Sequence, residues 1–221
     1  KEQVLESYRF PFTKIAISPW LQEIIKKESK NVFYIPNGLN FKKFYIKNTI
    51  NSRNYKSLLT LYHQDELKRS CDAIAAIEIV KSKIPDIEVS IFGVPSKPEN
   101  LPEWINYYQN PSQEKILELY NNAAIYIAAS RSEGFGLTLA EAMQCGCAVV
   151  CTDIGGYSVF AKDNETALLN EVYNVNEMAE NIQKLIINND LRYSIAFAGN
   201  ENIKQFTWEK SYLKFKEIIT R

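Results

Sequence analysis

Two glutamates flank a glycine-containing turn in the stretch SRSEGFGLTLAEAM, residues 130–143. Glu133 comes shortly after the apolar run AAIYIAA, and Glu141 lies in the helical pattern that follows. Gly134 and Gly136 have no Cβ, so the backbone at these positions can approach a ligand closely. The start of a helix offers unpaired N–H groups and a positive dipole end, which together bind phosphate or sugar oxygens.

The two carboxylates suit hydroxyl-bearing ligands. Glu133, at the carboxyl end of a strand, is placed to accept hydrogen bonds from sugar hydroxyls. Glu141 is placed to bind the two neighbouring hydroxyls of a ribose, as acidic residues do in dinucleotide sites. Either glutamate alone also fits a structural role, because an acid near the start of a helix stabilises the dipole. Because the strand, the glycines and the helix follow one another directly, a ligand site is favoured over a purely structural role for the two glutamates.

The composition excludes several classes of protein. The chain has 221 residues, 46% of them hydrophobic, and a net charge of zero, so we expect a soluble globular protein without a nucleic-acid partner. No apolar run approaches the roughly 20 residues that span a bilayer, and no signal peptide is visible. The sequence QCGCAVVCTD, residues 144–153, has no zinc-ligand spacing, so we expect reduced thiols, a cytoplasmic location and no metal site.

Strand-like runs alternate with helical patterns along most of the chain. The runs are residues 57–63, 87–93, 124–130, 147–152 and a short one at 166–169, with helices expected after the first run, at 112–121 and at 137–145. Nearly continuous apolar strands that alternate with helices predict an α/β fold with a doubly wound, Rossmann-like parallel sheet. Ligands of such a sheet bind outside the carboxyl ends of its strands.

The two ends of the chain differ from this pattern. Residues 14–18 predict another strand, 20–28 a helix, and the polar stretch 46–54 a linker. A helix is expected from about 175 to 186, with Asn174 and Glu177 as a capping box. A last helix follows Thr207 as its N-cap. We interpret its stripe of aromatic and aliphatic residues as core: Trp208, Tyr212, Phe215 and Ile219.

Together the motifs resemble the "group 1" family of retaining glycosyltransferases, which have the GT-B fold. The pattern E-x7-E of Glu133 and Glu141 is similar to that of the family's nucleotide-sugar half. IPNGLNFKKF (35–44), LYNNAAIYIAAS (119–130) and AVVCTDIGG (148–156) resemble further family motifs in the same order, with Asn40 where Asp is usual.

The resemblance implies a role for each matching residue. Glu133 would contact the donor sugar and Lys68 would neutralise the leaving diphosphate, which makes these two the catalytic candidates. Glu141 would bind the nucleotide ribose. The backbone amides around Gly134, Phe135, Gly136, Leu137 and Thr138 would hold sugar hydroxyls and diphosphate. A metal is not expected, because lysine and a helix N-terminus take its place.

Besides Asn40, three further positions depart from the family pattern. His63 stands where many members have a phosphate-binding arginine, so that contact would depend on an imidazole hydrogen bond. Val159 replaces a common glutamate and Ala167 a common glycine. None of these changes removes the E-x7-E motif.

The resemblance also sets the expected domains and chemistry. Residues 1–30 would be a remnant of an N-terminal acceptor domain, 31–55 a linker leading into the donor domain, 56–205 the nucleotide-sugar donor-binding domain, and 206–221 a C-terminal helix. The implied reaction moves a sugar from a nucleoside diphosphate to an acceptor hydroxyl by front-face transfer, with a double displacement through Glu133 as the alternative mechanism. The partners would be a nucleotide sugar and a glycan or lipid-linked acceptor of polysaccharide synthesis, and the full-length protein would be able to associate peripherally with the inner face of the membrane.

Two other functions remain open at this level. A noncatalytic nucleotide-sugar-binding module, or a subunit completed by a separate acceptor chain, fits the same site. A dehydrogenase-type Rossmann domain fits less well, because no G-x-G-x-x-G follows the first strand. The sequence identifies neither the sugar, the base nor the acceptor, and the chain by itself is expected to bind nucleotide but to transfer poorly.

Overall fold

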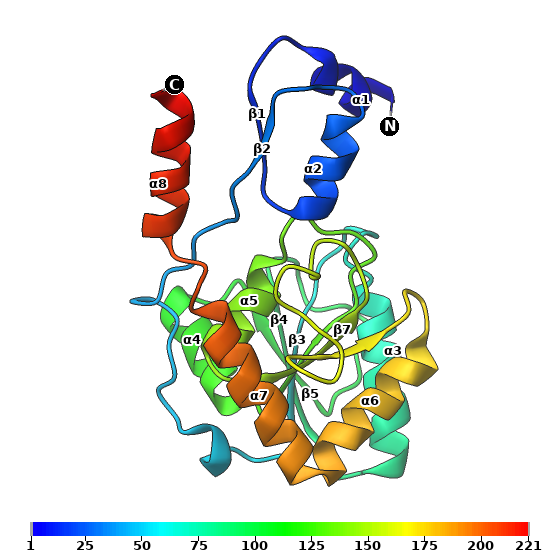
Figure 1. The fold of residues 1–221 in the computed structure, drawn as a ribbon. Coiled ribbons are helices and arrows are strands. Elements are labelled where there is room, and N and C mark those ends of the chain that lie inside the picture. The colour runs from blue at the N-terminus through cyan, green and yellow to red at the C-terminus, as the bar shows by residue number, and fades with distance from the viewer. Residues whose placement is uncertain (1, 221) are drawn as a thin grey trace.

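A parallel sheet of six strands forms the centre of the protein (Figure 1), whose computed structural model describes residues 2–220. The strands are β3 (Ser57–Leu61), β4 (Glu88–Gly93), β5 (Ile105–Gln109), β6 (Ile125–Ala128), β7 (Ala148–Thr152) and β8 (Leu168–Asn170). They lie in the order β5-β4-β3-β6-β7-β8, and every neighbouring pair is parallel. The predicted doubly wound α/β fold is therefore confirmed.

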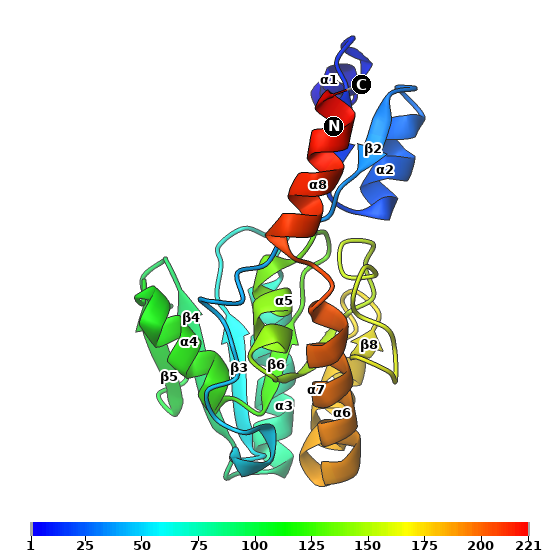
Figure 2. The same cartoon turned by 60° about the vertical axis from the view of Figure 1, so that its left-hand side comes forward.

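Helices cover both faces of this sheet, and each face has its own apolar core. On one face lie α3 (Ser70–Lys83) and α6 (Val175–Ile187), and on the other α4 (Gln113–Asn122) and α5 (Leu137–Gln144). Helix α7 (Asn189–Ile203) packs against α5, α6 and β7, beside α6 in both views (Figure 2). The central strands β6 and β7 are buried along their whole length, as expected of parallel strands covered on both sides.

The expected helix caps are partly confirmed. The Asn174 side chain accepts a hydrogen bond from the Glu177 N–H, which starts α6. The Glu177 carboxylate, however, accepts from the Asn174 side-chain amide and from the Glu171 N–H, so the second half of a capping box is absent at this helix. Thr207 caps the last helix as predicted, because its hydroxyl accepts from the Lys210 N–H.

Residues 2–34 form a smaller unit above the carboxyl ends of the main sheet (Figure 1). It contains α1 (Glu2–Arg9), β1 (Lys14–Ala16), α2 (Pro19–Lys26) and β2 (Val32–Tyr34), with β1 and β2 paired in parallel. Its core is small: Ala16, Ile25 and Val32, with Tyr8 and Leu21 packed against them. No helix between residues 2 and 220 is long and apolar enough to cross a membrane.

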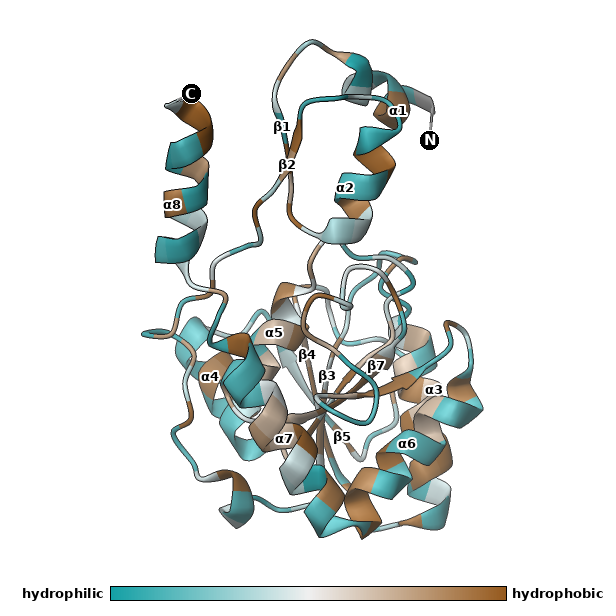
Figure 3. Ribbon diagram, in the orientation of Figure 1, coloured by the Kyte–Doolittle hydropathy of each residue, from teal (hydrophilic) through white to brown (hydrophobic). Residues whose placement is uncertain are grey.

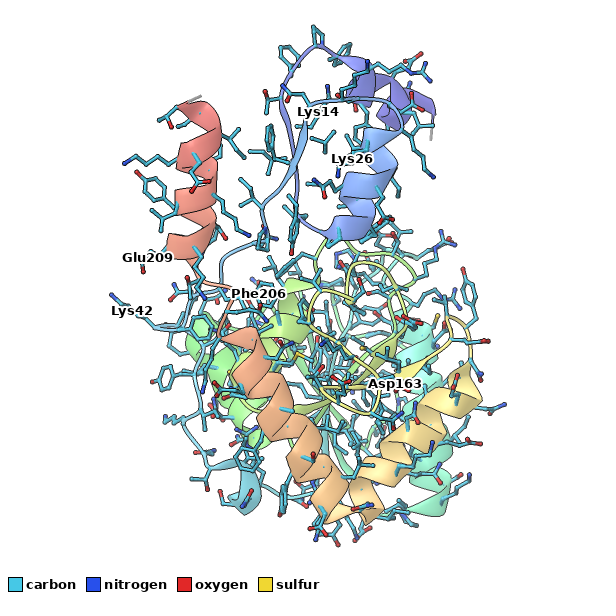
Figure 4. The ribbon with its side chains drawn as sticks, in the orientation of Figure 1. Lys14, Lys26, Lys42, Asp163, Phe206 and Glu209 are labelled. Carbon is cyan, nitrogen blue, oxygen red and sulfur yellow. The ribbon has the colours of Figure 1, made fainter. Side chains whose placement is uncertain are left out.

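The last helix, α8 (Trp208–Ile219), leaves the main body after Phe206 and stands beside the smaller unit (Figures 2 and 4). The interpretation of its stripe as core is wrong. Trp208, Tyr212, Phe215 and Ile219 are between 41% and 64% exposed. Helical periodicity shows that a helix has an apolar face, but not that other residues of the same chain cover it. In Figure 3, α8 carries separate brown segments among teal and pale ones.

Candidate functional site

The candidate site lies where β3 and β6 end side by side. These neighbours are the point at which strand order reverses, because the chain adds β4 and β5 on one side and β6, β7 and β8 on the other. Ligands of doubly wound sheets bind at this switch point. The loop after β3 carries His63 and Lys68, and the loop after β6 carries Glu133. The fold therefore brings two loops together that are far apart in the sequence.

Lys68 and Glu133 meet across this switch point. Lys68 Nζ lies 2.6 Å from Glu133 Oε1, and the Ser130 hydroxyl donates to the same oxygen at 2.9 Å. The side chains of the pair are 28% and 12% exposed, so the ion pair is largely shielded from water. One of the three ammonium N–H donors serves Glu133, which leaves two for another anionic group.

The turn after Glu133 needs glycine at one position for two separate reasons. Gly136, the N-cap of α5, has φ +88°, and a Cβ there would lie 2.4 Å from the ring of Tyr157. No side chain caps α5, so the N–H groups of its first turn remain available to ligand oxygens. Leu137 is exposed and Thr138 partly exposed at this end of the helix.

Phe135 contributes backbone rather than side chain to this turn. Its ring is 2% exposed and packs edge-on against Phe160 and Phe206, with centroids 5.3 and 5.8 Å away. The buried ring anchors the turn between the two glycines. The assignment of Phe135 as a donor-binding residue is therefore possible for its main-chain groups only.

A second glycine pair and the smaller unit close over the turn. A Cβ on Gly156 would lie 2.3 Å from the carbonyl oxygen of Glu133, and one on Gly155 would lie 2.4 Å from the Trp20 ring. A Cβ on Gly134 would be 3.0 Å from Ile17 Cδ1. The start of α2 thus forms one wall of the site, directly against its glycine-rich loops.

Glu141 lies one turn further along α5, on the side of α4. Burial raises the pKa of its carboxyl to about 7, although the Tyr120 hydrogen bond and the charge of Lys43 act in the opposite direction. The Tyr120 hydroxyl lies 3.3 Å from Glu141 Oε2. The charges of Glu133 and Glu141 both raise the pKa of the buried Tyr126, so the two acids flank that residue.

His63 is at the exposed end of β3. Its side-chain Nδ1 accepts a hydrogen bond from the main-chain N–H of Asp65 at 2.9 Å. The main-chain N–H of His63 donates to the Ser70 hydroxyl. In this arrangement Nδ1 is occupied within the loop, and Nε2 is the nitrogen that can donate to a ligand. The imidazole is on the correct loop for the role that the sequence suggests.

Several polar residues of the site carried no predicted role. A cavity of about 10 Å³, enough for one water molecule, lies behind the ion pair between Ser130, Tyr126, Tyr157 and Thr138. Tyr126 and Tyr157 are almost fully buried, and burial raises the pKa of both. A tyrosine within an apolar run is indistinguishable in sequence from a core aromatic, so only the position of Ser130 at the strand end gave a signal. Between residues 2 and 220 no three His, Cys, Asp or Glu side chains are grouped to hold a metal.

The chain matches one protein family over most of its length. Residues 46–201 match the family described as "Glycosyl transferases group 1". An uncharacterized glycosyltransferase of Methanocaldococcus jannaschii is 33% identical over 107 residues, which are 48% of this chain and 30% of that protein. A D-inositol 3-phosphate glycosyltransferase of Mycobacterium sp. is 31% identical over 119 residues, 48% of this chain and 27% of that protein.

The fold is also that of solved glycosyltransferases. A TarM variant of S. aureus, solved with fondaparinux, alpha-GlcNAc-glycerol and UDP, superposes with a TM-score of 0.83 at 23% identity. This match covers all of the present chain but 46% of the TarM chain. The chain therefore spans about half the length of this relative, and its matches cover under a third of the two curated relatives.

Proposed function

The chain belongs to the glycosyl transferases group 1 family, and from this membership we propose that it binds a nucleoside diphosphate sugar at the ends of β3 and β6. The protein would transfer the sugar to an acceptor hydroxyl with retention of anomeric configuration. The observation that carries the proposal is the ion pair of Lys68 and Glu133 beside the uncapped start of α5. Positive charge for a diphosphate and a carboxylate for a sugar thus lie together at the switch point.

The donor has a natural orientation in this site. The diphosphate lies against the N–H groups of Gly136 to Thr138 and the free N–H donors of Lys68, and His63 Nε2 adds a hydrogen bond. The sugar lies against Glu133 and the backbone of Gly134, and the ribose against Glu141. A charge pair ~4 Å apart at an effective dielectric of about 20 contributes roughly 4 kcal/mol. If half of this attraction appears only as the diphosphate leaves, the rate rises on the order of tenfold or more.

The surroundings of Glu133 favour front-face transfer over double displacement. Its carboxylate is paired with an ammonium group and accepts a second hydrogen bond from Ser130. Both contacts draw negative charge away from the oxygens and so lower their nucleophilicity. In this arrangement Glu133 stabilises positive charge on the sugar, and the leaving phosphate takes the acceptor proton.

We place the acceptor site on a second Rossmann-like domain to which the unit of residues 2–34 belongs. Two parallel strands of three residues each cannot form a stable sheet alone, because parallel sheets need cover on both faces and more strands. The family relatives are also longer than this chain. A glycan or lipid-linked acceptor of polysaccharide synthesis would enter between the two domains.

A noncatalytic nucleotide-sugar-binding module is the second candidate. The length of the relatives favours it for the isolated chain, which we expect to bind nucleotide sugar but to transfer sugar poorly. Robust sugar transfer by the 221-residue chain would contradict this expectation.

Calorimetric titration with UDP-, GDP-, ADP- and dTDP-sugars tests the binding proposal directly. UDP-sugars come first because the TarM variant was solved with UDP. We expect saturable binding of one donor class, no change on adding a chelator, and loss of binding in Glu141→Ala. The absence of saturable binding for all four nucleotides would overturn the proposal.

A further inference from the structure

Tyr120, on α4, reaches the site although its side chain is fully buried. Its hydroxyl lies 3.1 Å from the Thr138 carbonyl oxygen and 3.3 Å from Glu141 Oε2, both on α5. Its ring is fixed by edge-on or tilted contacts with Phe44, Phe92 and Tyr126, whose centroids lie 5.6 to 5.8 Å away. The hydroxyl is therefore held at one point relative to the Glu141 carboxylate.

Packing alone does not explain a hydroxyl at this position. A phenylalanine would fill the same aromatic box, and burying a hydroxyl is unfavourable unless it finds hydrogen-bond partners. The single proton of the hydroxyl has two acceptors, a helix carbonyl and a carboxylate. Both acceptors belong to the first turns of α5, where the proposed diphosphate and ribose contacts also lie.

We propose that Tyr120 is a positioning residue whose hydroxyl holds the Glu141 carboxylate in the orientation and the ionised form that accept the two ribose hydroxyls of the donor. This inference deepens the proposed function and rests on it. An ionised carboxylate can accept one hydrogen bond on each oxygen from two neighbouring hydroxyls. In a protonated carboxyl, one oxygen carries a proton and acts as a donor, so the group accepts less well from both hydroxyls.

The charges around Glu141 define its pH dependence. Tyr120 on α4 and Lys43 in the loop before β3 are the titratable groups that act on its pKa. Tyr126 on β6 and Cys145, the C-cap residue of α5, also face Glu141, because its charge raises the pKa of both. Burial is the largest influence and raises its pKa to about 7, while Tyr120 and Lys43 lower it. Removal of the Tyr120 hydroxyl therefore raises the pKa of Glu141 further and keeps the carboxyl protonated at neutral pH.

The test is Tyr120→Phe, titrated with the nucleoside diphosphate among UDP, GDP and ADP that wild type binds most tightly, and with its 2′-deoxy form. Titrations span about pH 5.5 to 8.5, the range in which a carboxyl of raised pKa changes charge. We expect affinity for the ribose form to rise with pH in wild type. In Tyr120→Phe it should be about tenfold weaker at neutral pH, in line with a hydrogen bond to a charged group.

The midpoint of the pH dependence should move to higher pH in Tyr120→Phe, and the preference for ribose over 2′-deoxyribose should shrink. Tyr193→Phe is the matched control, because it removes a hydroxyl that donates to the Asn51 carbonyl away from α5. It should behave as wild type, and thermal unfolding should show that both variants fold.

The outcomes separate this inference from the function on which it rests. An unchanged midpoint and ribose preference in Tyr120→Phe would overturn the inference, as would equal losses for the ribose and 2′-deoxy forms. Failure of wild type to bind UDP, GDP, ADP or dTDP would instead overturn the proposed function, and binding of dTDP alone would overturn this inference, because dTDP has no 2′-hydroxyl. Wild-type binding that prefers ribose but does not depend on Tyr120 would refute the positioning role alone.

Discussion

Lys68 Nζ and Glu133 Oε1 lie 2.6 Å apart, although the residues are 65 positions apart in the sequence. The pair joins the loop after β3 to the loop after β6 at the point where strand order reverses. Neither loop needs this contact to fold, since each strand is already held by its neighbours in the sheet. The ion pair therefore holds the Lys68 ammonium, which we assign to the diphosphate, at a fixed distance from the Glu133 carboxylate, which we assign to the sugar.

Replacement of Lys68 by methionine should weaken diphosphate binding selectively. The variant removes the ammonium group but keeps a chain of similar length, so we expect about tenfold weaker binding of the preferred nucleoside diphosphate and a shallower salt dependence. Binding of the corresponding nucleoside, which has no phosphate, should stay the same. Lys204→Met is the control, because Lys204 pairs with Glu201 at the exposed surface of α7. Equal losses for nucleoside and diphosphate would show that Lys68 supports the fold of the site instead.

Alanine should be tolerated at Gly134 but not at Gly136. At Gly136 the φ of +88° and the Tyr157 ring at 2.4 Å oppose a Cβ together, so Gly136→Ala should destabilise the protein by about 2–4 kcal/mol. At Gly134 the nearest atom is the end of the Ile17 side chain, which can move, and the cost should stay below about 1 kcal/mol. Urea unfolding of the two variants measures this difference. Similar losses would mean that the turn conformation is not fixed by Gly136.

The stability of the unliganded protein should depend on pH through Glu141. Its folded-state pKa of about 7 lies above the ordinary value of 4.5, so its contribution is fully present below about pH 4.5 and is lost as pH rises through about 7. Glu141→Gln stays neutral and lacks this dependence. Between about pH 5 and 8, wild type should lose roughly 2–3 kcal/mol of unfolding free energy relative to Glu141→Gln. Urea unfolding at both pH values is the measurement, and parallel behaviour of the two proteins would contradict the raised pKa.

The parallel sheet and the position of the E-x7-E glutamates at the ends of its strands could be predicted from the sequence. Apolar strands followed by helices identify a parallel sheet, and its topology then fixes where ligands bind. Contacts between segments far apart in the sequence could not be predicted from these patterns. Arg53 belongs to a polar stretch that predicts a linker, yet its buried guanidinium donates to the carbonyls of Tyr120, Ala123 and Cys145. Its partners are carbonyl oxygens and the Cys147 sulfur rather than an acidic side chain, so they leave no charge pattern in the sequence.

Strand β2 and helix α7 are among the elements that were absent from the sequence prediction. Strand β2 has three residues, too few to show a period, and it exists because β1 pairs with it. Helix α7 mixes small, polar and apolar residues, and its buried Arg192 breaks the apolar stripe by donating to carbonyls at the end of α6. Tertiary pairing determines both elements, and local pattern does not reveal it.

Two phenylalanines near the C-terminus test whether the apolar face of α8 is part of the core. Phe206 is 5% exposed and packs edge-on against Phe135 and Phe160, whereas Phe215 on α8 is 41% exposed. Phe206→Ala should cost about 3–5 kcal/mol, because it leaves a cavity in the core. Phe215→Ala should cost less than about 1 kcal/mol, because most surface substitutions have small effects.

The same two variants also test whether Phe206 supports the nucleotide-binding site. Since Phe206 supports the ring of Phe135, between Gly134 and Gly136, its loss should loosen the turn and also weaken binding of the preferred nucleoside diphosphate. Phe215→Ala should leave that affinity unchanged. Urea unfolding and calorimetric titration on the two variants measure both effects. A cost for Phe215→Ala equal to that for Phe206→Ala would mean that the apolar face of α8 is covered after all, and would restore its interpretation as core.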